Sequence, residues 1–248
     1  MLFIHNGILD EWIKKIKMII TDYKLHSQQE LFDIIRRTHL AGDETILPFH
    51  DAKISIQTVS YRDLVPTQTF VLNDQLANIY NIHTQMLRKG IDIFKLRGFL
   101  SYQIDRLNSA NSINENDQKT AENNSNIASN LNGGLDSAFV FTPPIIEVID
   151  NQPLVIDGQH RITYAKDNSI TFNALIIENI ASDVWPYQLP IAGGWDAVQR
   201  FKSELPAGFV RKQRRYPTSE MNKFFFREYP FPGIIKLMRA HSGKQDGR

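Results

Sequence analysis

The stretch PLVIDGQHRITYAK, residues 153–166, changes from a strand pattern to a helical pattern within a few residues. Its first four residues are those of a buried strand, and a helix is expected over residues 162–167. Between the two stand Asp157, Gly158, His160 and Arg161. A strand that passes through a glycine turn into a helix brings backbone N–H groups and polar side chains together. This arrangement predicts an anion-binding turn.

Each residue of the turn has a chemical role in that interpretation. Gly158 permits a positive φ, and the N–H groups of Gln159, His160 and Arg161 would be unpaired donors at the positive end of the helix. Arg161 can bind a phosphate bidentately, His160 can exchange a proton near neutral pH, and Asp157 can orient His160 or help to hold a divalent cation. The spacing fits a purely structural turn equally well, in which Asp157 caps the helix and pairs with His160 while Arg161 forms a surface salt bridge.

The composition is that of a globular protein. Of the 248 residues, 42% are hydrophobic and 22% are charged, and the chain has no cysteine. Disulfides, thiolate zinc sites and a cysteine nucleophile are therefore excluded. The first twenty residues carry acids and lysines among their apolar residues, which is typical of neither a signal peptide nor a membrane span. We expect a soluble, cytoplasmic protein without a membrane partner.

Positive charge is concentrated at the C-terminal end. Residues 200–248 hold twelve Lys or Arg against four acids, although the whole chain has a net charge of only +1. Arg211, Lys212, Arg214 and Arg215 form the densest cluster, followed by aromatic residues that can either stack on bases or pack internally. A polyanion such as DNA is one candidate partner for this cluster. Solvated charge, or contact with the acidic remainder of the chain, is the other interpretation.

The pattern along the chain alternates between helix and strand. Helices are expected over residues 8–41, 73–90 and 91–107, with a capping box at Ser27 and Glu30 and an N-cap at Asn73. Strands are expected over residues 52–61 and 170–180, and a hairpin over residues 144–157. Residues 108–137 are rich in Asn and Ser, which predicts a flexible insertion, either a plain surface loop or a lid.

The segment VIDGQHRITYAK resembles the signature of the ParB/sulfiredoxin superfamily, whose members carry DG-x-HR, GERR or GCHR at this place. Its DGQHR form resembles that of the regulators of DNA phosphorothioation. Upstream, VSYRDLVPTQTF resembles the first box of the superfamily, and TPPIIEVIDNQPLVIDGQHR resembles the second. The resemblance covers about residues 54–72 and 141–180.

The resemblance implies an α/β (α+β) fold with a mixed-sheet, nucleotide-binding domain over residues 51–182. Residues 1–50 would then be a helical N-terminal extension and residues 183–248 a basic C-terminal extension packed on the domain. It also implies a nucleoside triphosphate or diphosphate with Mg²⁺ as ligand. Asp157 and His160 would be catalytic, with Asp157 also near the metal, and the phosphates would meet a set of five residues: Gln68, Gly158, Gln159, His160 and Arg161.

Three departures from the superfamily pattern leave the reaction open. Gln68 stands where free-serine kinases of the superfamily have a catalytic Glu, and an amide cannot act as a general base. Gln159 replaces the cysteine of sulfiredoxins, and His160 replaces an arginine of the partition proteins, so neither activity carries over. The candidates are an NTPase or phosphotransferase linked to DNA, a small-molecule kinase whose base is Glu147 or Asp150, and a non-catalytic nucleic-acid-binding module. Nothing in the sequence sets the oligomeric state.

Overall fold

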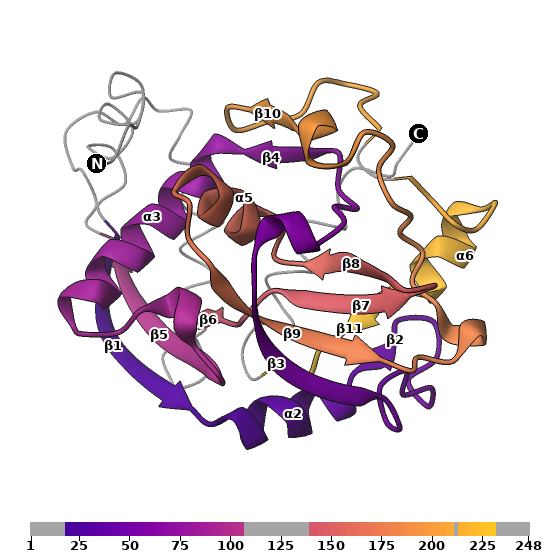
Figure 1. Cartoon of the computed structure of the whole chain (residues 1–248), viewed down its shortest axis with the longest axis horizontal. Coiled ribbons are helices and arrows are strands. Elements are labelled where there is room, and N and C mark those ends of the chain that lie inside the picture. Colours follow the sequence, from indigo (N-terminus) through magenta and orange to yellow (C-terminus); the bar gives the residue numbers. More distant parts are fainter. Residues whose placement is uncertain (1–17, 107–138, 211–212, 232–248) are drawn as a thin grey trace, which may run out of the picture.

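The computed structural model describes residues 18–106, 139–210 and 213–231 (Figure 1). The predicted insertion at 108–137 lies outside these ranges, as do residues 8–17 of the first predicted helix and the basic residues Arg211 and Lys212. Within the described ranges, no helix is long and apolar enough to cross a membrane.

A mixed four-stranded sheet forms the centre of the fold, in the order β3-β9-β7-β8. Its strands are β3 (Lys53–Val59), β7 (Ile145–Ile149), β8 (Gln152–Asp157) and β9 (Phe172–Glu178). β9 runs antiparallel to β3 and parallel to β7, and β7 and β8 form an antiparallel hairpin. These elements confirm the predicted strands and hairpin, and the mixed sheet with its helices confirms the predicted α+β class.

Helices cover both faces of this sheet. Along β9, Ala174 and Ile176 pack into a core with α3 (Asn73–Arg88) and α5 (Gln159–Asp167), whereas Leu175 and Ile177 pack on the other face with α2 (Gln28–Arg36). Alternate side chains of a strand point to opposite faces, so a strand buried on both faces is apolar throughout. The predicted capping box of α2 is confirmed, because Ser27 and Glu30 cap each other's backbone N–H groups. The predicted Asn73 cap is wrong, since the N-cap is Leu72 without a side-chain bond.

A second sheet has the order β1-β5-β6, and it overturns parts of two predicted helices, those at residues 8–41 and 91–107. It consists of β1 (Met18–His26), β5 (Phe99–Arg106) and β6 (Phe139–Phe141). Residues 18–26 and 99–106 are therefore extended, and only Ile93–Lys95 of the predicted helix at 91–107 is helical, as the 3₁₀ turn η2. Both segments contain β-branched and aromatic residues, and the pairing of β1 with β5 outweighs their helical spacing.

The C-terminal segment returns to strands near the N-terminus. β10 (Gln199–Phe201) runs parallel to β4 (Phe70–Leu72), and β11 (Arg227–Glu228) runs antiparallel to β2 (His39–Leu40). Three 3₁₀ turns, η1 (Tyr61–Asp63), η3 (Ser182–Val184) and η4 (Gly194–Ala197), and the short helix α6 (Ser219–Phe224) join these parts. In Figure 1, β10 and β4 lie together above α5.

Candidate functional site

The predicted strand–turn–helix is present between β8 and α5. β8 ends at Asp157, Gly158 has φ 94° and ψ 16°, and α5 begins at Gln159, three residues earlier than predicted. A side chain on Gly158 would bring its Cβ within 2.9 Å of Cβ of Pro144, so both the positive φ and the close packing require glycine. The N-cap residue Gly158 makes no side-chain cap bond, and no side chain of the described ranges caps α5. Among the described residues, the first N–H groups of the helix therefore have no side-chain acceptor, as an anion site requires.

Gln159 binds the loop that carries Gln68. The residue is 5% exposed, and its Oε1 accepts hydrogen bonds from the backbone N–H groups of Thr67, at 3.2 Å, and Gln68, at 2.9 Å. Its Nε2 donates to the Gln68 carbonyl oxygen. The side chain of Gln68 turns away from this contact and donates to the Phe70 carbonyl at 2.8 Å. Gln159 is thus a positioning residue that fixes the loop before β4 to the start of α5.

His160 is neutral at physiological pH. Burial lowers its pKa to about 4, against the opposing effect of the nearby Asp157 carboxylate. The backbone N–H of Leu72 donates to Nε2 at 3.0 Å, which leaves the proton on Nδ1. Among the described contacts, His160 therefore binds the backbone of β4 and not Asp157. The neutral ring can donate a hydrogen bond through Nδ1 but carries no positive charge.

Arg161 forms an internal ion pair with Asp157. The two charged groups contact each other directly, and the guanidinium also donates to the Thr142 carbonyl and, at 2.8 Å, to its Oγ1. The side chain of Arg161 is 12% exposed, whereas that of Asp157 is 37% exposed. The predicted phosphate ligand Arg161 is thus beside the turn but shared with Asp157, and a bound phosphate would compete with that carboxylate.

The turn could hold Mg²⁺ only together with a ligand. No group of three or more His, Cys, Asp or Glu side chains that could by itself hold a metal ion occurs in the described part of the chain. Asp157 is the acidic side chain at the turn, and its carboxylate is partly accessible. One carboxylate plus phosphate oxygens and water is a common coordination for Mg²⁺, so these residues fit a cation that arrives with a nucleotide.

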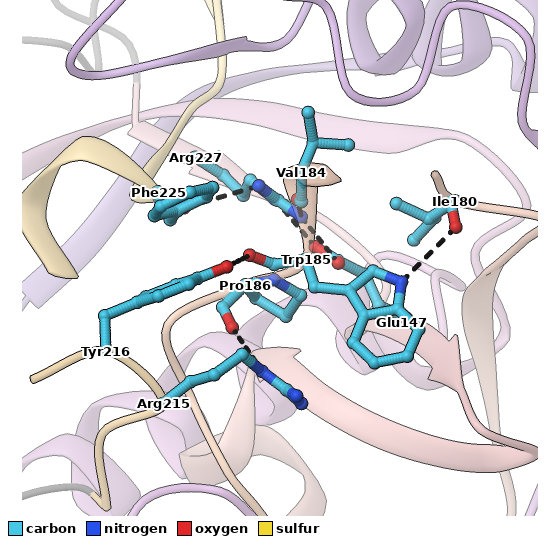
Figure 2. A network of polar contacts seen from close by, with 9 residues as sticks. All are labelled: Glu147, Ile180, Val184, Trp185, Pro186, Arg215, Tyr216, Phe225 and Arg227. Atoms are coloured by element: carbon cyan, nitrogen blue, oxygen red, sulfur yellow. Dashed lines mark hydrogen bonds and ion pairs between the residues drawn. The ribbon is translucent and has the colours of Figure 1, made fainter. Parts of the chain in front are cut away.

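The two alternative bases of the hairpin do not reach the turn. Glu147 is fully buried and pairs bidentately with Arg227, at 3.0 Å and 2.8 Å (Figure 2). Arg227 also donates to the Val184 carbonyl at 2.7 Å. Asp150 lies in the β7–β8 turn, at the opposite end of β8 from Asp157, about 16 Å away at the usual rise per strand residue. Neither carboxylate is placed to accept a proton at the DGQHR turn.

The basic C-terminal cluster is partly committed to internal contacts. Arg215 donates through Nε to the Pro186 carbonyl at 3.2 Å, and its guanidinium lies 4.9 Å from the centre of the Trp185 ring (Figure 2). Arg214 is exposed and donates to Oγ of Ser219 at 2.7 Å. Of the four basic residues predicted to contact nucleic acid, Arg214 is the described one that faces solvent.

Aromatic residues of the same segment pack on one another. Tyr216 stacks on Phe225 with ring centres 4.0 Å apart and donates to the Trp185 carbonyl at 2.8 Å. Phe226, which is 40% exposed, stacks on Tyr187. These rings therefore have protein partners, as expected for packing elements.

Sequence reasoning missed the partners of the motif. Thr142 accepts a hydrogen bond from Arg161, and Arg227 neutralises the charge of Glu147. The second pairing left a signal, because a glutamate in the apolar strand sequence IIEVI needs a buried cation. The roles of Thr142 and of the Leu72 N–H depend on tertiary packing and cannot be recognised from the sequence pattern.

Comparison with known proteins gives one family match. Residues 30–142 match the family model of the ParB CE domain. No curated protein and no solved structure matches the chain. The match supports the resemblance to the ParB/sulfiredoxin superfamily that the sequence predicted, and the mixed-sheet fold agrees with it. The DGQHR turn at residues 157–161 lies beyond the matched segment, so its likeness to the DGQHR type stays a prediction.

Proposed function

For a chain whose residues 30–142 are ParB-like, we propose that the turn between β8 and α5 binds the phosphate groups of a nucleoside diphosphate or triphosphate, with Mg²⁺. The observation that carries this proposal is the uncapped start of α5 after a left-handed Gly158, beside the guanidinium of Arg161. Backbone donors at a helix N-terminus and an adjacent arginine are the usual elements of a phosphate site.

Binding has stronger support than turnover. Gln68 is an amide, His160 is neutral and holds the Leu72 N–H, and Glu147 is paired with Arg227. Hydrolysis or transfer of phosphate would therefore depend on Asp157, which would have to leave Arg161 and hold the cation. A small-molecule kinase lacks a base at the turn among the described residues. Among the candidate functions, nucleotide binding therefore comes first, hydrolysis or transfer of phosphate second, and a small-molecule kinase third.

We propose further that the basic C-terminal segment contacts DNA, so that nucleotide and nucleic acid bind to different parts of one chain. The excess of positive charge in residues 200–248, the exposed Arg214 and the ParB-like match support this assignment. Contacts of this kind are electrostatic, so the affinity for a DNA duplex should fall steeply with salt. Absence of any affinity for DNA or RNA at low salt would contradict this half of the proposal.

The nucleotide site is tested by calorimetric titration of ATP, ADP and CTP with Mg²⁺. Arg161→Lys keeps a positive charge for Asp157 but removes the planar fork, and a lost charge-assisted bond corresponds to about 10- to 100-fold weaker binding. Arg97→Lys is the matched control, because Arg97 is an exposed arginine that donates to Gln28. A folded parent that binds none of the three nucleotides, or an Arg161→Lys variant that binds as tightly as the parent, would overturn the assignment.

A further inference from the structure

A serine, a histidine and a glutamate form a connected set of hydrogen bonds where β1, β5 and α2 meet. Nε2 of His26 lies 2.9 Å from Oγ of Ser101, and Nδ1 of His26 lies 3.2 Å from Oε1 of Glu30. In Figure 1, β1 lies beside β5 and leads into α2 at the lower left of the molecule. A hydroxyl, an imidazole and a carboxylate bonded in this order are the elements of an activated serine nucleophile.

The imidazole of His26 is held in one orientation by packing. It stacks on the ring of Phe99, with ring centres 4.0 Å apart and planes inclined by 3°, and its side chain is 15% exposed. Phe99 is itself buried in the core that α2 contributes to. A general base whose rotamer is fixed by packing and by hydrogen bonds is preorganised for proton transfer.

The carboxylate of Glu30 determines which nitrogen of His26 is free to accept a proton. The hydrogen bond from the Ser27 backbone N–H, followed by the contact with His26, lowers the pKa of Glu30 to about 2, so this group is ionised at neutral pH and accepts hydrogen bonds only. Nδ1 of His26 therefore carries a proton, and in the neutral ring Nε2 is left to accept the hydroxyl proton of Ser101. Oε2 of Glu30 is fixed by the capping box with Ser27, which leaves Oε1 for the histidine.

The same face of the sheet carries a cation next to the serine. Lys24 of β1 is directly opposite Ser101 of β5, and side chains opposite each other in an antiparallel pair share a face, with Cβ atoms about 5 Å apart. Within the described ranges β1 is the edge of its sheet, Lys24 is exposed and Ser101 is half-buried. Ser101 therefore keeps contact with solvent, and the ammonium group of Lys24 is near enough to stabilise negative charge that develops beside Oγ.

We propose that Ser101 is the nucleophile of a second site, which hydrolyses small carboxylic esters with His26 as its general base. Glu30 orients the histidine, and Lys24 stabilises the oxyanion of the tetrahedral intermediate. This site is independent of the nucleotide site, because α2 and α5 pack on opposite faces of the central sheet.

The reaction proceeds in two halves. Oγ of Ser101 bonds to the carbonyl carbon of the ester while its proton passes to Nε2 of His26, and the histidine gives that proton to the leaving alcohol oxygen as the C–O bond breaks. Water then attacks the acyl group on Ser101, with its proton passing to His26 and on to Oγ as the acyl bond to the serine breaks. One water is consumed, and a carboxylic acid and an alcohol are released.

A fluorophosphonate probe and p-nitrophenyl acetate test the proposal on the full chain. An activated serine forms a P–O bond with the probe while fluoride leaves, and mass spectrometry of the peptides locates the adduct. We expect the parent to be labelled at Ser101 and to release p-nitrophenol, and Ser101→Ala to lose both reactions. His26→Gln keeps an amide that can bond to Ser101 but cannot take its proton, so both reactions should become at least about 100-fold slower.

Ser55→Ala and His50→Gln are the matched controls. Ser55 is another half-buried strand serine, but its Oγ accepts a hydrogen bond from Gln57 at 3.0 Å. His50 pairs with Asp51 at 2.8 Å and has no contact with a serine among the described residues. Both controls should react at the rate of the parent.

Lys24→Met is a further test that leaves the serine, the histidine and the glutamate in place. Since Lys24 is exposed, the variant should melt at the temperature of the parent within a few degrees and hydrolyse the ester about 10-fold more slowly. A folded parent that is not labelled at Ser101, or a His26→Gln variant that is labelled as fast as the parent, would overturn the proposal. Labelling without ester hydrolysis that depends on Ser101 would overturn it as well.

Discussion

The buried pair between Arg227 and Glu147 sets the strongest expected effect of a single substitution. Their side chains are 2% and 0% exposed, and Arg227 also donates to the Val184 carbonyl. Arg227→Met leaves the carboxylate of Glu147 without a counter-charge in the core, which typically costs about 3–5 kcal/mol. For a chain of this size each kcal/mol corresponds to about 2–4 °C, so the melting temperature should fall by about 6–20 °C.

Urea unfolding of the parent and of Arg227→Met measures this loss directly. Arg62→Met is the control, because Arg62 is an exposed arginine that donates to Tyr61, and it should change stability by about 0.5 kcal/mol or less. In the double variant Glu147→Leu/Arg227→Met no charge is buried, so much of the loss should be recovered; the Val184 carbonyl still lacks its donor, at about 1–3 kcal/mol. A loss below about 1 kcal/mol in the single variant, or no recovery in the double variant, would refute the reasoning.

Three further predictions concern the turn and the basic segment. Gln159→Leu leaves the N–H groups of Thr67 and Gln68 without their acceptor, so the free energy of unfolding should fall by about 2–4 kcal/mol. Hydrogen exchange at these two amides should become faster, and unchanged exchange would contradict the contact. The pKa of His160 is about 4 in the folded protein, below its value in the unfolded chain, so the stability that the neutral ring contributes is present above pH 6.5 and is lost as the pH falls from 6.5 towards 4. His160→Gln should therefore reduce the difference in unfolding free energy between pH 7 and pH 5. In the parent, the NMR signal of the His160 ring should titrate near pH 4. Arg214→Gln should weaken DNA binding uniformly across sequences and reduce the slope of log K against log salt by about one, as measured by fluorescence anisotropy, and an unchanged slope would remove Arg214 from the interface.

The sequence predicted those elements whose pattern reflects local chemistry. The β7–β8 hairpin, the central strand β9, the amphipathic helix α3 and the capping box of α2 all depend on residues close together in the chain. The strands β1 and β5 were missed because their apolar spacing also fits a helix, and their pairing joins residues about 80 positions apart. No local pattern distinguishes these two outcomes.

The site was predicted in its composition but not in its contacts. Gly158 was identified correctly as the position that needs a positive φ. The partners of Gln159, His160 and Arg161 lie in the loop before β4, at the end of β4 and after β6, roughly 20 to 90 residues away. Whether a histidine accepts a backbone N–H or faces a ligand depends on which strand lies beside it, and tertiary packing decides that.

The pairing of β11 with β2 has a consequence for folding during synthesis on the ribosome. Leu40 is made about 190 residues before its partner Arg227, which at ordinary synthesis rates is a delay of roughly 10–40 s. Glu147 is likewise synthesised before Arg227, which neutralises its charge in the folded protein. Until the last fifth of the chain emerges, the nascent protein holds an unpaired strand edge and an uncompensated carboxylate, so the early intermediates are the species most exposed to aggregation or to capture by a chaperone.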